Sequence, residues 1–196
     1  MALIKSAVEI ALERTESVKV DKEALEADRA RKEGKMLASK FLSEPEVSLK
    51  DGLAGKDARV GRWMREGVIE ALLGNLVLPQ DALAARKVKR IAEGFASIGR
   101  NDKRLQQTFA QLEGFFREYV EERERLREMV AKQYEPVRKQ KEAELAQRTG
   151  QHVRIDPQSD PDYVNALRRA LGTIEDRYGG VLTKVKGEIG TLVAEK

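Results

Sequence analysis

The chain has 196 residues and a net charge of +4; 41% of its residues are hydrophobic, 36% are charged and only 5% are aromatic. This charged fraction is well above the roughly 25% of an ordinary globular domain and is typical of helices largely exposed to solvent. Because the chain has no cysteine and one histidine, disulfides, thiolate metal sites, cysteine nucleophiles and metal sites needing several histidines are excluded.

Composition also predicts the fold class and the compartment. Ala, Leu, Glu, Lys, Arg and Gln dominate, and all are good helix formers, so we expect an all-α fold. The apolar residues near the N-terminus are interrupted too often for a secretory signal, and no window approaches the roughly 18 apolar residues of a membrane span. We therefore expect a cytoplasmic protein that does not contact a membrane.

Residues 1–98 predict a smaller N-terminal helical region. Asp21 is the predicted N-cap of its second helix, and between Asp28 and Lys35 that helix could equally bend or continue straight. The stretch from Asp28 to Lys35 is almost entirely charged, so we expect that helix to contact other helices only at its ends. The four predicted helices cover about residues 2–17, 21–43, 57–73 and 79–98.

The helix at 57–73 is the most apolar part of the chain, and we predict that it forms the centre of a compact core. Gly61, Gly67 and Gly74 would allow neighbouring backbones to approach it closely. Before it, Pro45 ends the preceding helix and a Gly-containing connector follows, with room for one short turn that begins at Ser48. After it, Pro79 is expected in the first turn of the next helix.

Two signals disagree at residues 99–102. Gly99 followed by Asn101 and Asp102 is typical of a helix end next to a helix start. The apolar positions on both sides nevertheless keep one phase, from Val88 to Phe116, as in an uninterrupted helix. Both interpretations stay open at this point.

Residues 99–196 predict a long antiparallel coiled-coil hairpin, about 102–148 with 160–195, with a tip at 149–159. Pro136 should kink the first arm, and Gly179 with Gly180 should shift the phase of the second. The predicted seam of the first arm is Leu105, Phe109, Leu112, Phe116, Tyr119, Arg123, Leu126, Val130, Gln133 and Val137. The predicted seam of the second arm is Val164, Leu167, Leu171, Ile174, Tyr178, Val181 and Val185, and then Leu182, Ile189 and Leu192.

No catalytic, cofactor-binding or metal-binding site can be assembled from these residues. The acidic pairs lie among Arg and Lys, as on a solvated helix face. Residues 50–57 only superficially resemble a phosphate-binding loop, since Lys50 stands where the first glycine is needed and Asp57 where a hydroxyl is needed. We therefore expect no enzyme activity and no cofactor.

All the excess positive charge lies in residues 56–104, which contain 11 Lys or Arg and 6 Asp or Glu. Within them Arg86, Lys87, Lys89 and Arg90 form a candidate basic patch, with Arg59, Arg62 and Arg65 nearby in the sequence. Such a patch could bind the phosphates of a nucleic acid. A solvated surface or a protein contact is the favoured alternative, because the patch has no interleaved aromatic residues and no nucleic-acid-binding motif.

The hairpin tip is the second candidate surface. His152, Val153, Arg154 and Ile155 alternate between polar and apolar residues, a strand-like pattern in a helical chain. Loops held on rigid scaffolds often bind partners, although the tip could also be a plain connector. The leading hypothesis is a helical scaffold or adaptor that self-associates and holds a protein partner; a nucleic-acid-associated protein is the alternative.

Overall fold

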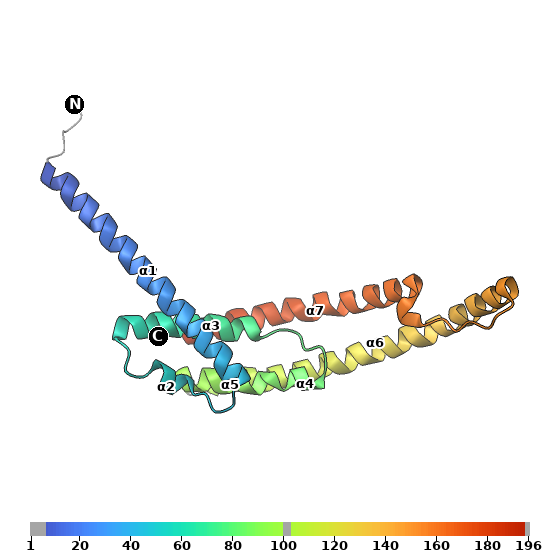
Figure 1. The fold of residues 1–196 in the computed structure, drawn as a ribbon. Helices are drawn as coiled ribbons and strands as arrows, with labels where there is room; N and C mark the ends of the chain where they lie inside the picture. The colour runs from blue at the N-terminus through green and yellow to red at the C-terminus, as the bar shows by residue number, and fades with distance from the viewer. Residues whose placement is uncertain (1–6, 100–102, 195–196) are drawn as a thin grey trace. The chain divides into compact units, whose positions relative to one another are not determined.

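The structure, a computed structural model, describes residues 7–99 and 103–194, and the side chains of residues 22–99 and 103–193 within them. These residues form helices and no strand, so the all-α class is confirmed (Figure 1). The elements are α1 (Ala7–Ser43), α2 (Leu49–Leu53), α3 (Ala58–Asn75), α4 (Ala82–Ala85), α5 (Lys87–Ile98), α6 (Lys103–Thr149), the 3-10 helix η1 (Pro157–Ser159) and α7 (Pro161–Ala194).

The chain forms two compact units. The first contains residues 1–76 and 90–102, and the second contains residues 77–89 and 103–196. Residues 77–89 therefore group with the second unit, whereas the sequence analysis assigned them to the N-terminal region. Because α5 passes from one unit to the other after Lys89, the two units are linked at three points of the chain.

In the first unit, α1 and α3 run in the same direction. Arg31 pairs with Glu66 at 2.9 Å and Lys35 pairs with Glu70 at 2.8 Å, and each pair is separated by 35 residues. A constant separation means that the two helices advance together. Parallel helices need a connection that returns along their length, and residues 44–57, with α2, provide it.

Glycines allow α1 and α3 to touch. A Cβ atom on Gly34 would overlap the carbonyl oxygen of Met64, and one on Gly67 would overlap that of Arg31. Gly34 lies in the charged stretch for which we expected no helix contact, so that expectation was wrong. The prediction holds for Gly67 but not for Gly61 or Gly74, beside which no backbone approaches closely. Around this contact Ala27, Ala30, Trp63 and Met64 are buried together.

Helix α1 continues from Ala7 to Ser43, so Asp21 does not begin a new helix. The predicted first residues of this region, 2–6, lie outside the described residues. At the other end of α1, Phe41 packs with Leu72 of α3 around Gly94 of α5. The short turn predicted at Ser48 is α2, whose N-cap hydroxyl accepts a hydrogen bond from the Asp51 N–H at 3.3 Å.

In the second unit, α4 begins at Ala82 and not at Pro79. The carboxylate of Asp81 accepts the Ala84 N–H at 2.7 Å and thereby caps the helix later than the proline suggested. Gln80 just before it is held by Arg123 of α6, which donates to its backbone carbonyl at 2.5 Å and to its side-chain oxygen at 2.6 Å. Arg123 is only 7% exposed, so a predicted seam position is occupied by a buried, hydrogen-bonded arginine.

Helix α5 ends at Ile98 and helix α6 begins at Lys103, so the two are separate elements. Residues 100–102 lie outside the described part. Helix α6 runs through Pro136 without ending. Its buried positions follow the predicted seam as far as Val130 and then shift to Tyr134, while Gln133 and Val137 are exposed. The predicted phase is therefore wrong beyond Val130, where the buried face of the helix moves round by one residue.

Helix α7 begins at Pro161, as its sequence predicts, and Figure 1 shows it beside α6. Glu122 pairs with Arg177, Tyr134 with Tyr163, and Lys141 with Asp160, so the residue numbers rise on α6 as they fall on α7. The two helices are therefore antiparallel. The phase shift predicted at Gly179 and Gly180 is present, since Leu182 is 5% exposed and Val181 is 43% exposed.

Candidate functional site: the segment between α6 and α7

The chain leaves α6 at Gly150. Its φ of +69° is a left-handed conformation that glycine adopts without strain, and its N–H donates to the Ala146 carbonyl at 2.9 Å. Residues 152–156 then have no regular structure, so the strand-like sequence pattern there forms no strand in the described structure. A single extended segment has no neighbouring strand with which to exchange hydrogen bonds.

The far end of this segment is anchored by Asp160. Its carboxylate accepts the Asp162 N–H at 2.8 Å, which caps α7, and also accepts hydrogen bonds from the Lys141 ammonium group at 2.8 and 3.0 Å. Lys141 bonds Asp162 as well, at 2.7 Å. These bonds fix the start of α7 against α6.

The electrostatics of this anchor follow from the same contacts. Hydrogen bonding from Lys141 lowers the pKa of Asp160 from an ordinary 3.8 to about 2. Hydrogen bonds to Asp160 and, second, to Asp162 raise the pKa of Lys141 well above its usual value. Burial, and next the contact with Asp160, raise the pKa of the neighbouring Tyr134. The anchor is therefore ionised throughout the neutral range.

Between its two ends, the segment returns along the last turns of α6 (Figure 1). The Ile155 N–H donates to the Glu142 carboxylate at 2.9 Å, and Ile155 is half-buried. A groove of about 440 Å³ lies between the helix and the returning chain. Its lining residues are Glu142, Ala143, Ala146, His152, Val153 and Arg154.

Three of the predicted tip residues, His152, Val153 and Arg154, thus meet in one groove, and Ile155 anchors it. The two alanines of α6 that line the groove, Ala143 and Ala146, were not predicted. No sequence pattern showed that the chain would turn back along the helix. Gly150 and the cap at Asp160 define the ends of this return, but not its path.

The predicted basic patch is not one surface of four free cations. Arg86, Lys87 and Lys89 are exposed, and none forms an ion pair with the described residues. Arg90 is 28% exposed, and its guanidinium stacks on Phe41 with 3.7 Å between Cζ and the ring centre. It also donates to the backbone carbonyls of Phe41, Glu44, Pro45 and Val47 at 3.0 to 3.2 Å.

The other arginines of the middle segment are also engaged. Arg59 lies near Glu23 and Glu26 and stacks on Trp63, Arg62 faces Glu66, and Arg65 donates to the Ile98 carbonyl. Arg59, Arg65 and Arg90 therefore connect elements of the first unit to one another. Arg86, Lys87 and Lys89, all in the second unit, are what remains of the candidate patch.

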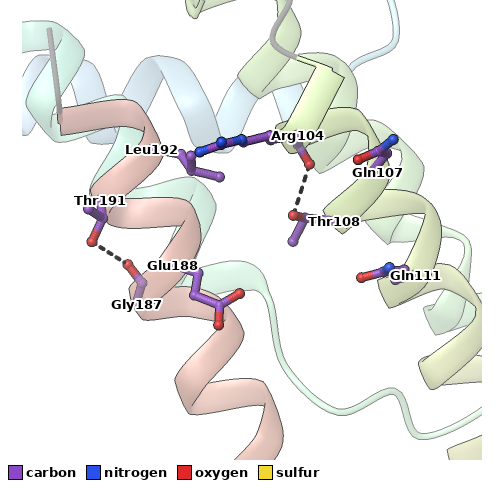
Figure 2. Close-up of a pocket in the computed structure, with 8 residues that line it drawn as sticks. All are labelled: Arg104, Gln107, Thr108, Gln111, Gly187, Glu188, Thr191 and Leu192. Atoms are coloured by element: carbon purple, nitrogen blue, oxygen red, sulfur yellow. Dashed lines mark hydrogen bonds between the residues drawn. The ribbon is translucent and has the colours of Figure 1, made fainter.

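A second groove lies between the first turns of α6 and the last turns of α7 (Figure 2). Its volume is about 600 Å³, and Figure 2 shows Arg104 of α6 reaching toward Leu192 of α7. Thr108 donates to the Arg104 carbonyl and Thr191 to that of Gly187, so both hydroxyls are used within their own helices. The lining residues are Arg104, Gln107, Thr108, Gln111, Gly187, Glu188, Thr191 and Leu192.

The described residues contain neither a metal-binding cluster nor a membrane-spanning helix. In residues 7–99 and 103–194, no three His, Asp or Glu side chains come together in a way that could hold a metal ion. Every helix in those ranges is too short or too polar to cross a bilayer.

A model of a family of unknown function, DUF6657, matches residues 50–191. The chain belongs to the DUF6657 family. The DUF6657 match contains α3 to α6 completely and most of α7, so both candidate surfaces lie inside it, and α1 precedes it. No curated protein and no solved structure matches the chain.

Proposed function

We propose that this protein is a non-enzymatic helical adaptor that binds a protein partner in the groove between the end of α6 and residues 152–154. The observation that carries the proposal is the fixed return of the chain, anchored by Glu142 at Ile155 and by Lys141 at Asp160. A binding loop that is held in place loses little conformational entropy when a partner docks. Val153 is 45% exposed in that loop, which leaves an apolar side chain for contact.

The test compares two variants in affinity capture from the native organism, read out by cross-linking and mass spectrometry. One variant combines His152→Ser, Val153→Ser and Arg154→Gln, and the control is Arg148→Gln, an exposed cation of the last α6 turn outside the groove. Ile155 and Asp156 are kept, since their bonds hold the segment. We expect one partner to be lost from the triple variant alone, at unchanged helicity. Equal capture by both variants would overturn the proposal.

We further propose that the protein self-associates through apolar side chains of α6 and α7 that the hairpin leaves exposed. Val137 on α6 and Val181 on α7 were predicted seam residues, yet they are 42% and 43% exposed. Apolar residues on a helix face usually pack against a further helix. Light scattering should show an oligomer that dissociates in the Val137→Ser, Val181→Ser variant; a monomer at high protein concentration would contradict this.

A second candidate function rests on Arg86, Lys87 and Lys89, which are exposed and form no ion pair within the described part of the chain, whereas Arg90 is engaged. These three cations could contact phosphates of RNA or DNA. The proposal predicts binding that weakens steeply with salt and is lost when the three are changed to Glu. Arg90 is left intact in this test, because its loss would disturb the fold itself. Absence of binding at low salt would remove this candidate.

A further inference from the structure

The backbone of residues 152–154 is open for pairing. Gln151 donates its N–H to the Thr149 hydroxyl at 3.3 Å and Ile155 donates to Glu142, but between them the N–H groups of 152–154 form no hydrogen bond with the described residues. Glu142 lies about 10 Å before the end of α6 at 1.5 Å per residue, so the segment runs back along the helix to reach it. Like the edge of a sheet, this segment has backbone N–H groups that a further strand can use.

The groove beside this backbone has apolar side chains on both of its sides. Ala143 and Ala146 form one side, and Val153 stands on the other. Its volume of about 440 Å³ lies within the range of roughly 300–1,000 Å³ found for ligand pockets. An apolar side chain of an extended ligand can therefore be seated against the two alanines.

The unsatisfied charge in the groove is positive. Glu142 accepts from the Ile155 N–H and lies 3.6 Å from Arg138, so its charge is already compensated. Arg154 is exposed and has no ion pair with the described residues. A guanidinium group prefers a carboxylate, which it can bind through two parallel hydrogen bonds.

We propose that the ligand of this groove is an extended peptide segment that places an apolar side chain against Ala143 and Ala146 and an adjacent carboxylate on Arg154. This inference rests on the proposed function and specifies its partner. The peptide's backbone would pair with residues 152–154 by strand addition. A single-stranded nucleic acid fits less well, because no Phe, Tyr or Trp ring lines the groove for a base to stack on.

The test selects binders from a displayed library of random peptides against the full chain. The enriched peptides are then measured by fluorescence polarisation with four proteins: wild type, Arg154→Gln, Ala146→Leu, which fills the groove with another good helix former, and the control Arg148→Gln. We expect enrichment of acidic residues next to apolar ones. Arg154→Gln and Ala146→Leu should each weaken binding about tenfold or more, while the control binds as wild type.

The other outcomes distinguish the inferred peptide ligand from the proposed adaptor function. Peptides that lack acidic residues but are still lost in Ala146→Leu would overturn the inference and leave the tip as a binding site. Peptides that bind both groove variants as tightly as the wild type would overturn the inference, and so would a library that yields no binders. In either case, the capture experiment alone tests the proposed function. Competition by a single-stranded oligonucleotide, lost in Arg154→Gln, would replace the peptide with a nucleic acid.

Discussion

Lys141 of α6 donates its ammonium protons to Asp160 at 2.8 and 3.0 Å, while Asp160 also accepts the first free N–H of α7, that of Asp162. One carboxylate, only 7% exposed, thus starts α7 and ties it to α6. The hairpin seam is aromatic further from the tip, where Tyr178 packs on Phe115 and Tyr119 with ring centres 4.9 and 5.0 Å apart. Near the tip, the contact between Lys141 and Asp160 adds to the ring pair of Tyr134 and Tyr163.

Replacing Lys141 with Met should loosen the tip. The substitution leaves the Asp160 carboxylate poorly exposed to solvent and without its cation. A buried charge without a partner destabilises the folded structure around it. Hydrogen exchange of residues 155–165 is expected to become faster, with the middle of α6 unchanged. Lys139→Met is the control, since Lys139 is 70% exposed and pairs only with Glu135. Equal protection of the tip in both variants would show that the anchor does not hold it.

The stability of the protein should fall in acid partly through Asp160. Its pKa is about 2 in the folded chain against an ordinary 3.8, so the unfolded chain binds more protons between these values. The stabilisation is therefore fully present above about pH 3.8 and is lost as the pH falls through 2. Urea midpoints of the wild type and Asp160→Asn, measured from pH 5 to pH 2, should converge toward acid. A constant difference between them would contradict the assigned pKa.

The sequence predicts the parts of this fold that depend on local signals. Pro161 after Asp160 begins α7, Ser48 begins a short helix, and Gly179 with Gly180 marks a change of buried face. Each of these features depends on residues within about one helical turn of it. The heptad pattern likewise predicts the buried face of α6 as far as Val130.

What the sequence does not predict depends on tertiary partners. Gly34 is surrounded by charged residues, so nothing local shows that its backbone meets α3. In the sequence Arg90 looks like the nearby Lys87 and Lys89, and only the path of residues 41–47 gives it carbonyl partners. The groove at the tip has the same origin, because it forms where the chain turns back along α6.

Two glycines, one at a helix contact and one in open space, should respond in opposite ways to substitution by alanine. Gly67→Ala should destabilise the protein by about 2 kcal/mol or more, because the added methyl group meets the backbone of Arg31 and the helices must separate. Gly180→Ala should stabilise it by up to about 1 kcal/mol, because α7 gains a better helix former and the new Cβ meets nothing within 4 Å. Urea unfolding measures both. A loss of stability in Gly180→Ala would mean that another helix packs there.

Two neighbouring cations of α5 should likewise differ. Arg90→Gln removes the donors of four backbone carbonyls and the guanidinium stacked on Phe41, so a loss of about 2 kcal/mol in unfolding free energy is expected. Lys89→Gln changes an exposed side chain without an ion pair in the described structure, so its effect should stay under about 0.5 kcal/mol. Chemical denaturation of both variants at one salt concentration makes the comparison direct. Equal effects would mean that Arg90 belongs with the exposed cations, and the nucleic-acid test would then have to include it.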